Sequence, residues 1–418
     1  MSDIVIIGGG IAGVTAALQC AQRKRQVQLV EEGEIGGVCL NRGCIPTKTM
    51  LHYLNLARKA RRAGEEGIFE GMGKAGAQVS LKGLQDYTVE RIAQLRYGMR
   101  FRLKKAGAAL IVARAKEEQD GSVSLFFPDG ARESLGIPNV LIQARGADWR
   151  PPEAVCGRKA EELLLPESLL TMEEVPKETA VIGAGVTGVE CAVILAGLGS
   201  RVSLYEKEDR ILPGFDEDAA GFVKMQLEEA GVRLFSNRAP EELPQDKVMW
   251  CGGSRKRDVE EDASKSRPGT FYIGDIREDC SLASQASRQA IDTVYEIFGE
   301  PAEKAAAVPS LVYVPFPVAQ ITSTDAELSK ERLVTAQAGY YTNGMAVSMD
   351  ETQGFVKIAA DRLTGELKSI VIAGEGADLM MGEASVLIGN HMTMEQLKRA
   401  VHPHPSLCEL LAECVAQL

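Results

Sequence analysis

Apolar and polar positions along the chain form two matching blocks, each of which predicts a strand, a tight turn, a helix and a second strand. The first block has a β-branched run at residues 3–9, apolar residues at helical spacing from Ile11 to Arg23, and a second apolar run from Val27 to Val30. Residues 179–206 repeat the same order. The chain is therefore predicted to contain two units of the dinucleotide-binding type, within an α/β fold.

The rest of the pattern predicts further helices and strands. A long helix is expected from about Leu84 to Lys105, and short strands and turns are expected over residues 108–144. Residues 308–418 form a third unit of mixed α and β character. Its strands are expected at Leu311–Val314, Gly354–Ile358 and Ile370–Gly374, and its helices at about Met380–Gly389 and Met394–Arg399.

Glycines stand at the turn of the first block. Gly8, Gly10 and Gly13 form a G-x-G-x-x-G motif, which tightens the turn, lets the backbone approach a pyrophosphate and lets the helix pack closely on the sheet. Glu31 follows Gly8 by 23 residues, where a carboxylate can accept hydrogen bonds from ribose hydroxyls. The motif predicts a bound dinucleotide, and its N-terminal position together with a nearby cysteine pair favours FAD.

The second block carries the same motif at Gly183, Gly185 and Gly188, and again an acid, Glu206, follows by 23 residues. Two such units in one chain suit a flavoenzyme that exchanges hydride with a nicotinamide. A carboxylate at Glu206 would bond a free ribose 2′-hydroxyl but repel a 2′-phosphate, so NAD is favoured over NADP.

Two cysteines, Cys39 and Cys44, lie in a glycine-flanked loop that leads into an amphipathic helix. We interpret them as a redox disulfide. An undistorted helix would separate positions five apart by about 7.5 Å along its axis, whereas a disulfide needs Cα atoms at about 4.4 to 6.8 Å, so the first turn must be bent.

Gly43 and Pro46 indicate that the regular helix begins just after Cys44. Cys44 would then lie at a helix N-terminus, where the helix dipole lowers the pKa of a thiol. The alternative is a pair of cysteines in a loop without chemistry.

Two of the four histidines lie in the run from His402 to Glu409. One interpretation is a turn bounded by prolines, without chemistry. The other takes His404 as an acid/base group and Glu409 as the carboxylate that orients it. The neighbouring Cys408 could add a third thiol to the site or serve as a packing residue.

Composition limits the classes of function. A chain of 418 residues accommodates two or three domains, and a net charge of −11 argues against a nucleic-acid partner. No signal peptide and no apolar run of membrane-spanning length is predicted, and no metal site is expected. The odd number of cysteines, nine, is untypical of a secreted disulfide framework, so a cytoplasmic enzyme is expected. Five of the cysteines are predicted to be packing residues: Cys20, Cys156, Cys191, Cys251 and Cys280.

The run from Cys39 to Lys48, CLNRGCIPTK, resembles the active-site segment of the class I pyridine nucleotide-disulfide oxidoreductases, and is most similar to that of the dihydrolipoyl dehydrogenases. The resemblance spans nearly the whole chain. It implies two Rossmann-like domains, for FAD and NAD, and a C-terminal α+β dimerisation domain. The implied boundaries are 1–146 and 267–305 for the FAD domain, 147–266 for a shortened NAD domain, and 306–418 for the dimerisation domain.

The resemblance also implies roles for single residues. Lys48 would pair with Glu190 near the flavin N5, although a surface glutamate is the alternative for Glu190. Gly274 and Asp275 occupy the place of the family's Gly-Asp pair, whose aspartate bonds the ribitol of FAD. His404 and Glu409 would act on the disulfide of the partner subunit, so a homodimer is expected.

The chain departs from the family pattern in three places. Fewer than forty residues separate Val232 from Gly269, where relatives carry several more strands of the NAD domain. Residues 247–253 resemble the strand that leads back to the flavin domain, and the charged run at 254–266 is expected to be a mobile loop. Arg145 replaces a threonine at the crossing between domains, so that crossing is expected to contact the flavin differently.

Together these features predict an FAD-dependent enzyme that oxidises protein-bound dihydrolipoamide, or a small dithiol, with NAD⁺. One alternative is a flavin-binding redox partner or regulatory paralogue with impaired NAD turnover, which the shortened segment would allow. Another is a different NAD(P)H-dependent disulfide reductase, such as glutathione or mercuric reductase. Glu206 argues against an NADPH enzyme, and the chain has no adjacent C-terminal cysteine pair of the mercuric type.

Overall fold

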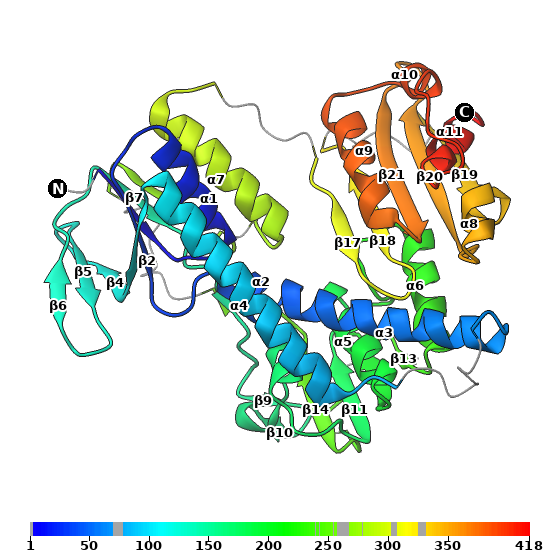
Figure 1. Ribbon diagram of the computed structural model, residues 1–418, viewed down its shortest axis with the longest axis horizontal. Helices are drawn as coiled ribbons and strands as arrows, with labels where there is room; N and C mark the ends of the chain where they lie inside the picture. The colour runs from blue at the N-terminus through cyan, green and yellow to red at the C-terminus, as the bar shows by residue number, and fades with distance from the viewer. Residues whose placement is uncertain are drawn as a thin grey trace.

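The computed structural model describes residues 3–69, 78–238, 240–241, 243–253, 255–256, 267–277, 279–301, 307–324 and 332–418. Three β-sheets of four or five strands and their helices form most of the part of the chain that the structure describes, together with the long helix α3 (Cys44–Glu65). Figure 1 shows α3 crossing the middle of the molecule, with the second sheet on one side and the C-terminal sheet on the other. Mixed α/β architecture was predicted, and it is confirmed.

The first sheet is parallel, with strand order β16-β7-β1-β2-β3. Helices α1 (Ile11–Gln22) and α7 (Ala283–Phe298) lie side by side on it and share one hydrophobic core with its strands. The sheet is assembled from two separate segments of the chain, because β16 follows the second sheet in the sequence. Its strands are β1 (Ile4–Ile7), β2 (Val27–Glu31), β3 (Ala109–Val112), β7 (Val140–Gln143) and β16 (Thr270–Tyr272).

The second sheet is also parallel, with order β13-β12-β11-β14. Helix α5 (Val186–Gly197) packs on one face, where Val181, Val202 and Leu204 belong to the same core as the helix. Helix α6 connects β12 to β13, and the described residues between β13 and β14 form neither a helix nor a strand. The bounds are β11 (Glu178–Ile182), β12 (Arg201–Tyr205), β13 (Arg233–Phe235), β14 (Lys247–Trp250) and α6 (Glu217–Glu229).

A short antiparallel pair, β8 (Ala147–Asp148) with β15 (Arg255–Lys256), lies where the chain crosses between these sheets. The prediction of a mobile loop at 254–266 is therefore wrong at 255–256, where the backbone pairs with β8. The other residues of that loop, 254 and 257–266, lie outside the described residues.

The third sheet is antiparallel, with order β17-β18-β21-β20-β19. Its core is shared with α9 and with α11, which lies at the C-terminus (Figure 1). Two of its strands, β18 and β19, were not predicted. Strands β20 and β21 are each three residues longer than predicted, and β17 begins one residue earlier and ends two residues earlier than predicted. The elements are β17 (Ser310–Val312), β18 (Val318–Thr322), β19 (Leu333–Gly339), β20 (Gly354–Asp361), β21 (Leu367–Gly374), α8 (Gly344–Ser348), α9 (Ala377–Gly389), α10 (Met394–Lys398) and α11 (Glu409–Val415).

The remaining long helix, α4 (Leu81–Ala106), crosses α3 in Figure 1. Its N-cap is Ser80, whose hydroxyl accepts from Gly83 N. Among the described residues, no helix is long and apolar enough to span a membrane. Smaller elements complete the chain: α2 (Gly37–Asn41), a three-stranded sheet of β4 (Arg114–Glu117), β5 (Val123–Phe126) and β6 (Arg132–Ser134), and the pair β9 (Ala154–Val155) with β10 (Arg158–Lys159).

Candidate redox site

Cys39 and Cys44 lie on either side of a break between two helices. Cys39 belongs to α2, Arg42 and Gly43 leave the helical conformation, and Cys44 is the first residue of α3. Both cysteines are partly buried free thiols, and their side chains are hydrogen-bonded to each other. The structure therefore has the interrupted first turn that a disulfide between these positions requires.

The two thiols differ in their electrostatic surroundings. The hydrogen bond from Cys39, followed by the charge of Lys48, lowers the pKa of Cys44 to about 7, against the opposing effect of burial. The same hydrogen bond, together with burial, raises the pKa of Cys39. A negative charge on this pair is consequently localised on Cys44, at the N-terminus of α3, where the helix dipole favours it.

Lys48 and Glu190 form the ion pair that the family resemblance implied. The Lys48 Nζ lies 2.9 Å and 2.7 Å from the two carboxylate oxygens of Glu190. Glu190 is 3% exposed, and burial raises the pKa of its carboxyl, an effect that Lys48 opposes. The surface-glutamate alternative is excluded by this burial. Lys48 also lies one helical turn after Cys44 on α3, so its charge is close to the thiol.

The first glycine motif forms a turn that only small residues fit. A Cβ on Gly8, whose φ is +107°, would lie 2.3 Å from the Ala144 carbonyl oxygen, and a Cβ on Gly13 would lie 1.8 Å from the Gly8 oxygen. Gly10 is the N-cap of α1 and has no side chain to bond the first N–H groups of the helix. Those N–H groups suit a phosphate.

Glu31 lies beside this turn. Its two oxygens accept hydrogen bonds from Gly9 N at 2.6 Å and from Gly33 N at 2.9 Å. Each carboxylate oxygen keeps a further lone pair, which a ribose hydroxyl can use. The turn and its acid therefore fit the pyrophosphate and ribose of a dinucleotide.

The second glycine motif repeats this geometry. A Cβ on Gly188 would again lie 1.8 Å from the oxygen of the first glycine, Gly183, whereas a Cβ on Gly185 would have nothing within 4 Å. Glu206 accepts from Ala184 N at 2.7 Å and from Glu208 N at 3.1 Å. The open side of Gly185 leaves room for a second dinucleotide next to the backbone.

Gly274 and Asp275 follow β16 and are brought to the N-terminal end of α1. Gly274 has a φ of +77°, and a Cβ there would lie 3.2 Å from the Cβ of Ala12. Asp275 is partly buried, and burial raises the pKa of its carboxyl. The Cys280 thiol donates to this carboxylate at 3.7 Å. An acid at this position can bond hydroxyls of a cofactor whose phosphates lie at the α1 turn.

His404 and Glu409 form a second pair in the C-terminal domain. The imidazole Nδ1 lies 2.8 Å from Glu409 Oε1, and the other oxygen accepts from Ser406 N at 2.9 Å. Both bonds lower the pKa of the Glu409 carboxyl. The His404 side chain is 81% exposed, and no hydrogen bond between the described residues joins it to Cys39 or Cys44. The structure therefore brings His404 and Glu409 together, and the imidazole ring faces solvent.

Several residues around these pairs were not singled out from the sequence. Asn343 donates to the Ser406 oxygen at 3.0 Å and holds the histidine turn, and it also caps α8. Asparagine is a favoured N-cap residue, so the place of Asn343 directly before α8 is a sequence signal from which it could have been found. Tyr313 contacts both Lys48 and Glu190. The sequence shows only a single tyrosine at the end of a strand, which does not indicate these contacts.

Two residues that the sequence did single out are engaged in the structure. Arg145 donates to Gln143 Oε1 at 2.9 Å and to the Ala115 oxygen at 3.0 Å, so its guanidinium ties β7 to β4. Cys408 packs against the core of the C-terminal domain, and burial raises the pKa of its thiol. Among the described residues, no three His, Cys, Asp or Glu side chains form a group suited to a metal ion.

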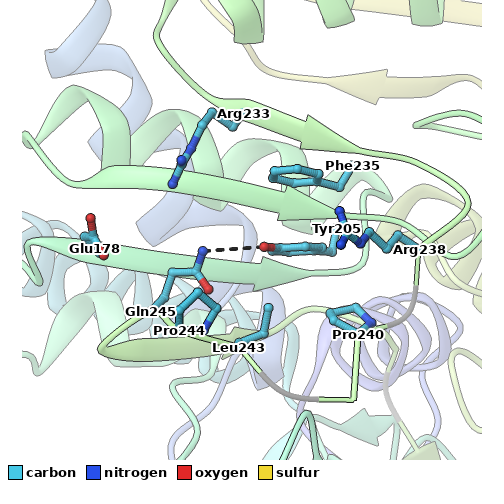
Figure 2. A pocket seen from close by; sticks show the side chains of 9 residues that line it. All are labelled: Glu178, Tyr205, Arg233, Phe235, Arg238, Pro240, Leu243, Pro244 and Gln245. Carbon is cyan, nitrogen blue, oxygen red and sulfur yellow. Dashed lines mark hydrogen bonds between the residues drawn. The ribbon is translucent and has the colours of Figure 1, made fainter.

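A separate cavity of about 420 Å³ lies on the face of the second sheet that α5 does not cover. Figure 2 shows the side chains that line it. The rings of Tyr205 and Phe235 stack there at 4.7 Å, and Gln245 donates to the Tyr205 hydroxyl at 3.4 Å. None of the predicted site residues lines this cavity. Its walls are formed by Glu178, Tyr205, Arg233, Phe235, Arg238, Pro240, Leu243, Pro244 and Gln245.

Residues 2–259 match the model of the pyridine nucleotide-disulphide oxidoreductase family, and residues 308–415 match the model of its dimerisation domain. The chain is 28% identical to dihydrolipoyl dehydrogenase 3 of Haloarcula marismortui over 462 positions, which cover 99% of this chain and 95% of the relative. It is also 28% identical to a dihydrolipoyl dehydrogenase of Bacillus subtilis over 455 positions, with coverages of 99% and 95%. Both alignments are longer than the 418 residues of this chain, so these relatives contain residues that it lacks.

Solved structures share the fold over the whole chain. LpdA from Mycobacterium tuberculosis superposes with a TM-score of 0.90 at 23% identity, covering 100% of this chain and 99% of that one. The HOCl-induced flavoprotein disulfide reductase RclA from Escherichia coli, as a cysteine-to-serine mutant, superposes with a TM-score of 0.85 at 19% identity, covering 99% of each chain.

Proposed function

The chain belongs to the pyridine nucleotide-disulphide oxidoreductase family, and from that premise we propose that it oxidises dihydrolipoamide to lipoamide with NAD⁺. The observation that carries the proposal is the polarised thiol pair, in which Cys44 has a pKa of about 7 beside Lys48 while Cys39 remains protonated. A dithiol oxidase needs this division between a thiol that exchanges with substrate and a thiolate that is stabilised after exchange.

FAD and NAD are the cofactors of this family, and the residues at both glycine turns fit them. We assign FAD to the first turn, with Glu31 at the ribose and Asp275 at the ribitol hydroxyls. NAD is assigned to the second turn, with Glu206 at the ribose. When bound, FAD supplies the two-electron chemistry that links the dithiol to NAD⁺.

The protein side of the reaction is thiol–disulfide exchange. In the oxidised enzyme, a substrate thiolate attacks the sulfur of Cys39 in the Cys39–Cys44 disulfide, and Cys44 leaves as a thiolate. The second substrate thiol then loses its proton and attacks the substrate sulfur of the mixed disulfide, and Cys39 leaves as a thiolate that takes up a proton. This step releases the cyclic disulfide product and leaves both cysteines reduced. Lys48 and the N-terminus of α3 stabilise the Cys44 charge throughout.

His404 is the proposed base that takes the substrate proton, with Glu409 holding its Nδ1 so that Nε2 faces the thiol. Because the imidazole is exposed and is not bonded to the cysteines of its own chain, we propose that it serves the cysteines of the partner subunit. The matched dimerisation domain supports a homodimer. The substrate's carrier is proposed to be a lipoyl-bearing protein, with a small dithiol as the other candidate.

We also propose that the enzyme works in the cytoplasm, since its other seven cysteines are free thiols, as a reducing compartment maintains them.

Turnover of free dihydrolipoamide with NAD⁺ by the FAD-loaded protein tests the function. Wild type should form NADH, and Cys44→Ser should keep bound FAD but lose turnover, because the thiolate that accepts the exchange is gone. The matched control is Cys408→Ser, which removes a packing thiol and should retain turnover. A Cys44→Ser protein that still oxidises dihydrolipoamide would contradict the assignment.

An anaerobic titration separates the enzyme from a redox partner without nicotinamide turnover. NADH should bleach the flavin of the proposed enzyme. Bleaching by dithiols alone, with none by NADH, would favour the redox partner and would place the defect in the short segment between β13 and β14.

A further inference from the structure

The Lys48–Glu190 ion pair is in contact with Tyr313, a residue of the C-terminal domain that follows β17. The Tyr313 backbone N–H donates to Glu190 Oε1 at 3.0 Å. The Tyr313 ring faces Lys48, whose ammonium nitrogen lies 5.1 Å from the ring centroid. One residue therefore contacts both members of the pair, and it comes from a different domain than either.

The far end of the Tyr313 side chain lies near Asp378, in the first turn of α9. Burial, followed by the negative charge of Asp378, raises the pKa of Tyr313, so the phenol stays protonated. The ring therefore has Lys48 on its face and Asp378 near its hydroxyl.

The position of Lys48 matters because its charge acts on Cys44. Lys48 follows Cys44 by one turn of α3, and its charge lowers the pKa of that thiol, whereas the charge of Glu190 raises it. The lysine side chain is 32% exposed and has a flexible four-carbon stem. Glu190 restrains the ammonium from one direction, and the aromatic face of Tyr313 restrains it from another through a cation–π contact.

We propose that Tyr313 is a positioning residue, which holds Lys48 against Glu190 and so keeps the lysine charge one helical turn from the Cys44 thiol. The inference rests on the proposed function in that Cys44 is taken as the reacting thiolate. It makes the C-terminal domain part of the electrostatic environment of the redox thiol. Tyr313 exerts this effect through Lys48 and does not itself react.

The test compares variants at two aromatic residues of one connection, between β17 and β18. Tyr313→Leu removes the ring that faces Lys48, and Tyr313→Phe keeps the ring but removes the hydroxyl. The matched control is Phe316→Leu, because the Phe316 ring faces a different α3 cation, Arg58, at 4.8 Å. The measurement is the rate of Cys44 alkylation by iodoacetamide against pH in the reduced, FAD-loaded protein, with the melting temperature recorded in parallel.

Loss of a cation–π contact of ordinary strength should shift the inflection of the Tyr313→Leu profile upward by about half a pH unit, leaving about threefold less thiolate below the inflection. Tyr313→Phe should restore most of the wild-type inflection. Phe316→Leu should lower the melting temperature and leave the inflection in place. If Tyr313→Leu does not fold, Tyr313→Met removes the ring with a side chain of similar length.

An unshifted inflection in the variants that lack the Tyr313 ring would overturn the inference, and so would an equal shift in Phe316→Leu, which would indicate a general packing effect. The proposed function fails separately, if wild type does not oxidise dihydrolipoamide. The alkylation profiles do not depend on that turnover, so the two failures are distinguishable.

Discussion

Lys48 Nζ lies 2.7 Å from Glu190 Oε2, and the carboxylate is almost completely buried while the lysine remains partly exposed. The pair joins the redox helix α3 to α5 of the second dinucleotide unit. Removing the charge of one partner leaves the other poorly compensated. Because Glu190 also raises the pKa of Cys44, the pair affects both stability and thiol reactivity.

Glu190→Gln should therefore lower the free energy of unfolding by about 1 to 3 kcal/mol, less than for a fully buried pair because Lys48 is in contact with water. The glutamine oxygen can still accept from Lys48 and hold it in place, so the loss of the negative charge near the thiol should also lower the pKa of Cys44. Urea denaturation and Cys44 alkylation measure the two effects. Glu178→Gln, which breaks an exposed pair with Arg201, is the control and should cost about 0 to 1 kcal/mol. An equal loss of unfolding free energy in Glu190→Gln and Glu178→Gln would contradict the description of Lys48–Glu190 as a pair with a buried carboxylate.

The pH dependence of the thiols gives the second prediction. In the reduced wild-type enzyme, Cys44 should react with iodoacetamide at a rate that rises as the pH increases through about 7 and falls below it, because only the thiolate is nucleophilic. Cys39, whose pKa is raised, should remain unmodified over the same range. Mass spectrometry of the labelled peptide distinguishes the two positions. Preferential labelling of Cys39 near neutral pH would reverse their roles.

Cofactor choice is the third prediction and depends on Glu206. Its carboxylate is 8% exposed and is fixed by Ala184 N and Glu208 N, so a 2′-phosphate placed there meets a buried negative charge. NADH should reduce the flavin faster than NADPH does. Glu206→Gln should lower the ratio of the NADH rate to the NADPH rate by about tenfold. This amount is typical of one hydrogen bond to a charged group.

Stopped-flow flavin reduction with both nucleotides measures this preference. The control is Glu31→Gln, at the equivalent position of the first turn, which should weaken FAD retention and leave the nucleotide preference of the remaining holoenzyme unchanged. Faster reduction by NADPH in wild type would show that Glu206 is not at the ribose.

Local constraints made much of the fold and site predictable. The turns at Gly8 and Gly183 depend on glycines a few residues apart, and the break before Cys44 depends on the adjacent Gly43, so sequence spacing carries the information. The Lys48–Glu190 pair could be placed only through the family resemblance, because its members are distant in the sequence.

Other features depend on tertiary packing and left no periodic signal. Strand β18 is a five-residue segment whose pairing with β17 and β21 defines it. At 255–256 a charged run forms a strand because β8 offers a partner, which overrides the preference of charged residues for loops. Tyr313 was missed because its contacts with Lys48 and Glu190 join three separate parts of the chain.

The last prediction concerns the exposed imidazole of His404. A base that is 81% exposed and bonded to Glu409 of its own chain reaches a thiol pair only if another surface is brought against it. The dimerisation domain supplies such a surface in a second copy. Two inactive proteins, Cys39→Ser and His404→Gln, should therefore complement each other when their subunits are exchanged. Each heterodimer then contains one site with intact cysteines and an intact histidine.

Dihydrolipoamide oxidation should return to about half of the native value per heterodimer, because one of its two sites is complete. Differently tagged subunits, purified sequentially, give the heterodimer fraction. Mixing Cys39→Ser with a double variant that carries both Cys39→Ser and His404→Gln is the matched control and should restore nothing, because every site in that mixture lacks Cys39. Heterodimers without recovered turnover would mean that His404 acts within its own chain or serves only the structure of its turn. The exposure of the His404 ring, which is not bonded to the cysteines of its own chain, favours recovery.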